Sequence, residues 1–352
     1  MAKVRVAIVG SRFAADIHCD AYTRNSNVEI VAIAALDNLD AIAKKWGIRT
    51  TYEDYNQMFA VECPDLVSVC VPNFLHHEVV IAASNAGLNV VCEKPLATTV
   101  EDGREMLEVC ERNRTRLFYA EDWCFSPTIM RMDALIKEGG IGKLFYAKAK
   151  ETHNGSHSPF AKTLKMCGGG SFIHLAVHPI GYLLHLLGRG ENPVVEVSGH
   201  MTGGLDRNFV HKDFEGEDFG IGMMRFGNGE VGFVEGNYIT VGGMDDTVEI
   251  YGAEGVLKAD LTFGSNIQCY SRKGISYSIE KTDHNLGWTR PAVDEFYGLG
   301  YVNEMSYFVD CVVRKEEPMY GVSGRAGLAC VQLVDAFYES HKCGRRITGS
   351  WM

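Results

Sequence analysis

The chain has 352 residues, of which 46% are hydrophobic and 22% charged, so it can bury a sizeable core and is long enough for two domains. This composition argues against a disordered chain. The formal net charge is -11, and the sequence contains no basic run that could bind a phosphate backbone. Both features argue against nucleic acid as a partner.

No membrane or secretory segment is expected. The apolar run at residues 4–9 is short and leads into Gly10 instead of a cleavage site. Residues 172–187 are more apolar, but they contain three histidines and a proline and are fewer than the roughly 20 residues that cross a bilayer. They predict a buried helix. The 11 cysteines form no CxxC pair, which favours reduced thiols in a cytoplasm.

The first 120 residues alternate predicted strands and helices. Gly87 suits a helix C-terminus, and Thr98 and Glu101 have the spacing of a capping box. The expected strands are 4–9, 28–35, 65–71, 89–92 and 117–120, and the expected helices run from Gly10 to residue 25, over 40–46 and 76–86, and onward from about Thr98. This order predicts a doubly wound parallel sheet.

The pattern changes after residue 121. A helix at 127–138 precedes a series of alternating segments, which predict a mostly antiparallel sheet with helices on one face. The expected strands are 144–151, 194–200, 220–226, 231–238, 247–251 and 256–261, with late amphipathic helices at 304–313 and 325–341.

A glycine-containing turn follows the first predicted strand; it consists of Gly10, Ser11, Arg12, Phe13 and Ala14. At such a turn the start of the next helix offers free N–H groups to a pyrophosphate. Arg12 replaces the second glycine of the dinucleotide-binding pattern, and its charge could substitute for close backbone approach. An ordinary strand-to-helix turn is the alternative.

The end of the second strand bears on the choice of cofactor. The acidic residue that usually binds the adenosine ribose is absent there or displaced to Asp37. No arginine or lysine follows at once to hold a 2'-phosphate. The sequence therefore favours NAD over NADP.

Polar residues follow the next strands at the same edge of the sheet; they are Pro72, Asn73, His76, Glu93 and Lys94. Ligands of open α/β sheets bind at this edge. A proline fixes the turn after Lys94, so we expect its ammonium group at the crevice, a surface lysine being the alternative.

Gly168, Gly169 and Gly170 lead into the apolar helix that carries His174 and His178, four residues apart on one face. Two such imidazoles can share proton transfer or bind a metal, although core packing is the commoner role. His153 and His157 could join them around a divalent ion. No carboxylate or cysteine has a strong ligand spacing, so we expect no metal.

Three segments carry a resemblance over nearly the whole chain: residues 92–97, Pro72 and Asn73 with His76, and 168–178. Together they resemble the glucose-fructose oxidoreductase and inositol dehydrogenase family. The resemblance implies a Rossmann domain at 1–121 and, at 122–352, an α+β substrate-binding and oligomerisation domain whose last helices could pack back on the first. It also implies a homodimer or homotetramer and hydride transfer between NAD(P) and a carbinol carbon of a sugar, sugar acid, glycoside or cyclic polyol.

The resemblance also assigns roles. Lys94 matches the lysine that hydrogen-bonds the reacting oxygen, and His178 matches the general acid/base. A sugar hydroxyl is a very weak acid, so its oxidation needs both a base and a cation. We expect the cofactor to contact the turn at residues 10–14, Asp37, and the polar residues that follow the later strands. These last residues are Pro72, Asn73, His76, Glu93 and Lys94. The expected substrate contacts are Lys94, Trp123, His153, Asn154, His157, His174 and His178.

His174 occupies a position where many members carry aspartate. A neutral imidazole cannot supply a fixed negative charge, so either His174 relays the proton with His178 or another acid, such as Glu121 or Asp122, replaces the aspartate. Two other functions stay open: redox-neutral isomerisation, elimination or cleavage through transient oxidation by retained NAD, and non-catalytic NAD sensing.

Overall fold

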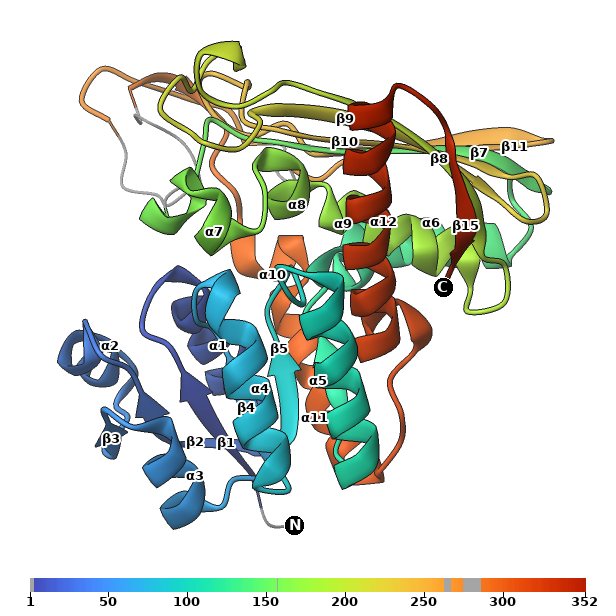
Figure 1. Ribbon diagram of the computed structural model, residues 1–352. Helices are drawn as coiled ribbons and strands as arrows, with labels where there is room; N and C mark the ends of the chain where they lie inside the picture. The colour runs from blue at the N-terminus through green and yellow to red at the C-terminus, as the bar shows by residue number, and fades with distance from the viewer. Residues whose placement is uncertain (1–2, 157, 263–266, 275–285) are drawn as a thin grey trace. The chain divides into compact units, whose positions relative to one another are not determined.

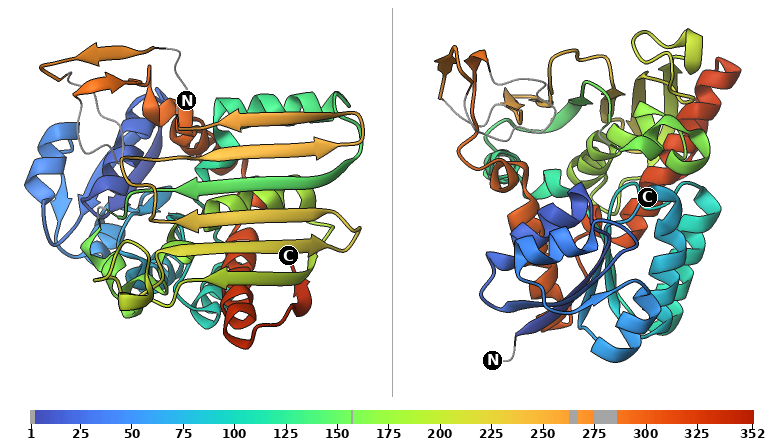
Figure 2. Two further views of the ribbon diagram at one scale, coloured as in Figure 1. Left: turned by 90° about the horizontal axis from the view of Figure 1, so that it is seen from above. Right: turned by 90° about the vertical axis from the view of Figure 1, so that its left-hand side faces the viewer.

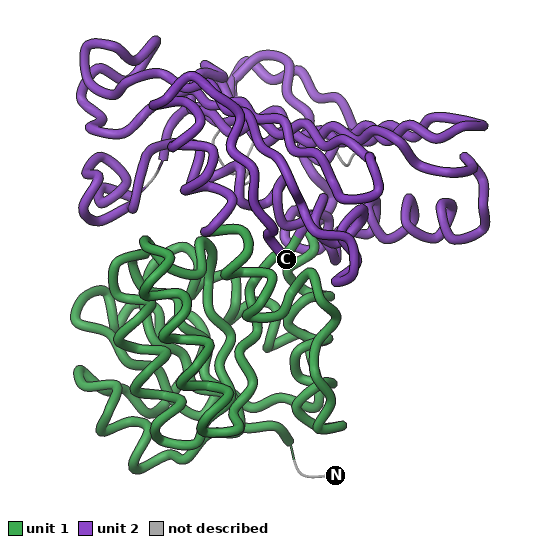
Figure 3. Tube along the Cα trace, turned by 45° about the vertical axis from the view of Figure 1, so that its right-hand side comes forward, with its two compact units in different colours: residues 1–122, 300–331 green, residues 123–299, 332–352 purple. Residues whose placement is uncertain are grey.

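The computed structural model describes residues 3–156, 158–262, 267–274 and 286–352. The chain divides into two compact units, which Figure 3 colours separately. Unit 1 spans residues 1–122 and 300–331, and unit 2 spans residues 123–299 and 332–352. Each unit contains a large sheet of its own.

The sheet of unit 1 is parallel, and its strand order is β3-β2-β1-β4-β5-β6. This is the order of a doubly wound dinucleotide-binding sheet. β4 is buried at every position, as expected where helices cover both faces. The strands are β1 (Val4–Val9), β2 (Val28–Ala34), β3 (Thr51–Tyr52), β4 (Leu66–Val69), β5 (Asn89–Cys92) and β6 (Leu117–Tyr119).

Helices lie on both faces of this sheet (Figures 1 and 2). They are α1 (Phe13–Thr23), α2 (Leu39–Trp46), α3 (Tyr55–Glu62), α4 (His76–Asn85), α5 (Val100–Asn113) and α11 (Tyr301–Arg314). Although α11 comes from far along the chain, it packs against α1. The long helix α12 (Gly324–Cys343) contributes its residues up to 331 to unit 1 and the remainder to unit 2.

The larger sheet of unit 2 has the order β12-β11-β7-β10-β9-β8-β15. Only β7 and β10 pair in parallel among these described strands; the other neighbours are antiparallel. The strands are β7 (Leu144–Thr152), β8 (Val194–Met201), β9 (Phe219–Phe226), β10 (Val231–Asn237), β11 (Thr247–Gly252), β12 (Gly255–Asp260) and β15 (Ile347–Trp351). A separate pair is formed by β13 (Cys269–Ser271) and β14 (Gly287–Thr289).

The helices of unit 2 lie on one face of its large sheet, as the left view of Figure 2 shows. Besides the second part of α12, they are α6 (Pro127–Lys137), α7 (Leu164–Cys167), α8 (Ser171–Leu175), α9 (Val177–Leu183) and α10 (Glu295–Leu299), with a π-helical turn at Leu184–Gly188. The predicted fold class, a doubly wound parallel sheet followed by a mostly antiparallel sheet with helices, is therefore confirmed.

Two local predictions are wrong. The single helix expected at 172–187 is broken at Ala176 into α8 and α9. Pro179 has no N–H to donate, and the new helix starting at Val177 places it in a first turn, where no intrahelical donor is needed. The capping residue of α5 is Thr99, not Thr98, because the Thr99 hydroxyl accepts from the N–H of Asp102 at 3.1 Å.

Several short elements were not predicted, namely β3, α3, α7, α10, β13, β14 and β15. Among the described residues, no single helix is long and apolar enough to cross a membrane. Two consecutive helical segments, Leu164–Leu175 and Val177–Gly188, are together long and apolar enough for a membrane span, but by length and composition only. The chain bends by 54° between them.

Candidate functional site

The turn after β1 requires glycine at residue 10. Gly10 has a φ of +124°, and a Cβ there would lie 2.1 Å from the carbonyl oxygen of Cys70. α1 begins two residues after Ser11, so its first N–H groups lie at the carboxyl end of the sheet. Phe13 and Ala14 form the start of that helix. This backbone arrangement fits a pyrophosphate, which is the part of NAD that such a turn holds.

Asp37 lies just beyond β2 and organises the side chains of the same turn. One carboxylate oxygen accepts from the Ser11 hydroxyl at 2.9 Å, and the other accepts from the Arg12 guanidinium at 2.5 Å. The hydrogen bond from Arg12, followed by that from Ser11, holds the pKa of Asp37 below its usual value. In this structure Arg12 therefore binds the carboxylate expected to bind the ribose.

His76 joins the loops that follow β4 and β5. Its Nδ1 lies 2.8 Å from the carbonyl oxygen of Pro95, and its Nε2 lies 3.0 Å from that of Val71. Burial lowers the pKa of His76, although the two carbonyl groups act in the opposite direction. Both ring nitrogens face backbone, so His76 holds this edge together. Asn73 is buried in the short helix that links Pro72 to α4.

Glu93 and Lys94 follow β5 at the same edge. Glu93 contacts His18 through one oxygen and accepts from the backbone N–H of Lys94 through the other, at 3.1 Å. The Lys94 side chain is half-buried. The strand order of unit 1 places this segment next to the loop after β4, so the predicted cofactor residues share one edge of the sheet.

Glu304 on α11 is a buried acid of unit 1 that no motif indicated. Burial raises its pKa well above the usual value, and the charges of Asp122 and Glu93 add to that effect. Glu304 is about 180 residues or more from Asp122 and Glu93 in the sequence, so no local motif links them. Its place beside them follows from the packing of α11 against α1.

His178, on α9 of unit 2, is almost fully buried among polar and aromatic groups. Its ring stacks on that of Trp123, with the centroids 6.0 Å apart and the planes at 8°. Its Nε2 lies 3.8 Å from Oε2 of Glu151 on β7. Glu151 Oε1 in turn lies 3.2 Å from Nε2 of His153, just after β7. The structure thus brings together three predicted residues and one, Glu151, that was missed.

His174 has different neighbours because the helix is broken between the two histidines. The hydroxyl of Tyr238, directly after β10, hydrogen-bonds Nδ1 of His174. Phe160 lies near the same ring, with centroids 6.2 Å apart. Burial raises the pKa of Tyr238 well above its usual value, so its hydroxyl stays protonated. Tyr238 is a further residue that sequence reasoning missed.

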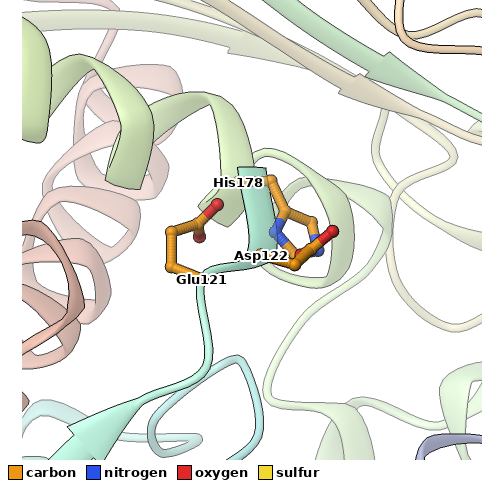
Figure 4. A group of neighbouring side chains, drawn as sticks. All are labelled: Glu121, Asp122 and His178. Atoms are coloured by element: carbon orange, nitrogen blue, oxygen red, sulfur yellow. The ribbon is translucent and has the colours of Figure 1, made fainter. Parts of the chain in front are cut away.

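The remaining predicted residues are placed as follows. Asn154 is half-buried in the turn after His153. His157 lies outside the described residues. Figure 4 shows Glu121 and Asp122 on the segment that leaves β6 and His178 on its helix. Both acids are buried.

Comparisons with known proteins match both halves of the chain. A model described as an oxidoreductase family with an NAD-binding Rossmann fold matches residues 4–121, and a model for a C-terminal alpha/beta domain of the same family matches residues 133–348.

Three similar proteins match this chain over nearly its full length. D-glucoside 3-dehydrogenase of Escherichia coli K12 is 26% identical, covering 98% of this chain and 97% of its own. Inositol 2-dehydrogenase of Rhizobium meliloti is 25% identical, covering 98% and 99%. The crystal structure of GenD2 from gentamicin A biosynthesis in complex with NAD has a TM-score of 0.89 at 22% identity, covering 99% and 97%, and shows the same fold. The chain belongs to the oxidoreductase family that combines an NAD-binding Rossmann fold with a C-terminal alpha/beta domain, named for glucose-fructose oxidoreductase, inositol dehydrogenase and MocA.

Proposed function

We propose that this oxidoreductase transfers hydride between NAD and a carbinol carbon of a sugar, sugar acid, glycoside or cyclic polyol. The observation that carries the proposal is the set of proton-accepting groups around His178, in a chain that also has the NAD-binding fold. The names of the similar dehydrogenases, which act on a glucoside and on inositol, support the same substrate class.

In this proposal Lys94 and His178 act on the reacting hydroxyl. His178 accepts the hydroxyl proton, and the Lys94 ammonium group stabilises the negative charge that develops on oxygen. Bound NAD supplies the hydride acceptor. The carbinol then becomes a carbonyl compound, and the two hydrogens leave as hydride and proton. Trp123, His153, Asn154 and His174 provide aromatic and polar contacts for the hydroxylated ring.

The proposed cofactor site comprises the turn after β1, Asp37 and the loops after β4 and β5. Asp37 supports NAD over NADP, because a carboxylate accepts from a ribose hydroxyl and repels a 2'-phosphate. We assign residues 1–121 to the cofactor domain and residues 122–352 to substrate binding and oligomerisation, with α11 of the second segment packed back on the first domain.

We further propose a homodimer or homotetramer that forms through the large sheet of unit 2 and works in the cytoplasm. Outward positions of neighbouring strands carry apolar side chains, including the cross-strand pair Met223 and Phe233. Light scattering should show an oligomer that dissociates in Phe233→Glu. A wild-type monomer would contradict this part of the proposal.

The free cysteines of the described residues support a reducing compartment, as proposed for the cytoplasm.

Activity is tested with purified protein, NAD or NADP, and a panel of polyols, aldoses, sugar acids and glycosides, by following the absorbance of the reduced nicotinamide. Lys94→Met and His178→Ala should each abolish substrate-dependent reduction. Matched controls are Lys44→Met on exposed α2 and His185→Ala beside Asp133, which should stay active. NAD binding without reduction on any substrate would favour redox-neutral chemistry or NAD sensing instead.

A further inference from the structure

We propose that Glu151 is the positioning carboxylate of His178 and supplies the negative charge that His174 cannot. This inference rests on the proposed function of His178 as a proton acceptor. Glu151 has 4% of its surface exposed and His178 has 3%, so little water screens their interaction. Glu151 Oε2 lies 3.8 Å from His178 Nε2.

The position of Glu151 follows from the alternation of β7. Ala147, Ala149 and Glu151 all face the helix-covered side of the sheet and are buried. The two alanines fill a closely packed core, whereas Glu151 places a carboxylate at the end of the same row. A strand end is where such a group can reach neighbouring loops and helices.

The neighbouring strand lets the broken helix come close to that carboxylate. Glu151 pairs with Gly236 of β10. A Cβ on Gly236 would lie 2.5 Å from the backbone nitrogen of Ala176, the residue at the break between α8 and α9. The hydroxyl of Ser171 also donates to the Gly236 carbonyl oxygen at 3.0 Å. Gly236 therefore allows the break, and with it His178, to lie against the strand pair that carries Glu151.

His153 holds the other side of the carboxylate. Its Nε2 lies 3.2 Å from Glu151 Oε1 and 4.0 Å from Oδ1 of Asp246. Asp246 is itself fixed by the backbone N–H of Thr152, which donates to the same oxygen at 3.1 Å. Glu151 is thus placed between two imidazoles, with Asp246 as the next acidic group of unit 2.

His174 cannot provide the same charge. It has no carboxylate, and its Nδ1 is hydrogen-bonded to the Tyr238 hydroxyl. When His178 takes the hydroxyl proton it becomes a cation, and a carboxylate about 4 Å away stabilises that form. Glu151 exchanges no atom in this step: the proton moves from substrate to His178, the hydride leaves carbon, and Glu151 stays ionised.

The test compares Glu151→Gln and Glu151→Asp with Glu235→Gln, a control on β10 that faces the opposite side of the sheet. Glu151→Gln should lower kcat about 100-fold, with substrate KM and NADH affinity changed less than about threefold. Glu151→Asp should have a kcat at least about 10-fold higher than that of Glu151→Gln, because aspartate keeps the negative charge. Unchanged kcat in Glu151→Gln, or equal losses in the two variants, would overturn the inference.

A second readout does not depend on turnover. The 15N signals of the His178 ring, identified by their loss in His178→Ala, report the protonation of the ring when they are followed through a pH titration. The pH at which these signals change from those of a neutral ring to those of a cation should be lower in Glu151→Gln than in wild type, and unchanged in Glu235→Gln. An unchanged midpoint in Glu151→Gln would overturn the inference even if no substrate were found. A lowered midpoint without turnover on any substrate would instead count against the proposed function while keeping Glu151 beside His178.

Discussion

His18 on α1 and Glu93 after β5 form a buried contact, with His18 Nε2 lying 2.9 Å from Glu93 Oε1. The His18 side chain is fully buried, and that of Glu93 is 13% exposed. Burial acts to raise the pKa of Glu93, but the hydrogen bond and charge of His18, together with Lys94, outweigh burial and hold the pKa below its usual value. The contact therefore keeps a charged carboxylate against the backbone of Lys94.

Removing His18 should destabilise the protein by leaving that charge unpaired. We expect His18→Phe to lower the free energy of unfolding by about 3 kcal/mol at pH 8, and the double variant with Glu93→Gln to lose less. Because the folded-state pKa of Glu93 is depressed, this stabilisation is present above the unfolded pKa and is lost as pH falls through the folded one. Urea denaturation measures both losses. Equal losses in the two variants would mean that the charge of Glu93 is not the cause.

Asp37 should govern the preference for NAD. Asp37→Ser removes the carboxylate that opposes a 2'-phosphate and releases Arg12 from its partner. We expect the ratio of NADPH to NADH affinity to rise at least about 10-fold, which corresponds to about 1.4 kcal/mol. Fluorescence titration with the reduced cofactors measures this ratio. Asp40→Ser, which removes an exposed charge three residues away, should leave it unchanged.

Much of the fold could be predicted because its signals are local. β1 and β5 have the predicted bounds, since each is a short, mostly apolar segment bounded by polar or turn residues. The two-residue β3 is too short to show a period. α3 buries only Met58 and Phe59, so it shows no apolar stripe.

The candidate site shows the same limit. Lys94 and His178 lie in recognisable motifs, whereas Glu151 and Tyr238 are single residues at strand ends. Their places depend on the pairing of β7 with β10 and on the break at Ala176, and no spacing along the chain encodes either. The one available signal was local: Glu151 and His153 are two residues apart, so they face the same side of a strand.

Gly170 should tolerate no side chain. A Cβ there would lie 2.1 Å from the carbonyl oxygen of Glu217 and 2.4 Å from its nitrogen, and backbone atoms cannot rotate away. We expect Gly170→Ala to lower the free energy of unfolding by about 3 kcal/mol. Gly298→Ala is the control, because nothing lies within 4 Å of its Cβ, and it should be neutral or stabilising by up to about 1 kcal/mol. Thermal melting of the two variants measures the difference. A Gly170→Ala protein as stable as wild type would show that this turn can move.

Glu217 should make stability depend on pH near neutrality. It is buried beneath the start of α8 and accepts from the backbone N–H of Phe172 at 2.9 Å and from the Tyr338 hydroxyl at 2.9 Å. Burial raises its pKa to about 7, and these hydrogen bonds only partly oppose that effect. The folded state therefore binds more protons than the unfolded state between about pH 4.5 and pH 7, so the contribution of Glu217 falls as pH rises through that range, by on the order of 3 kcal/mol. Glu217→Gln cannot titrate. Urea denaturation of both proteins from pH 5 to pH 8 should give stability curves that separate by that amount, and parallel curves would show that Glu217 is already ionised in the folded protein at pH 5.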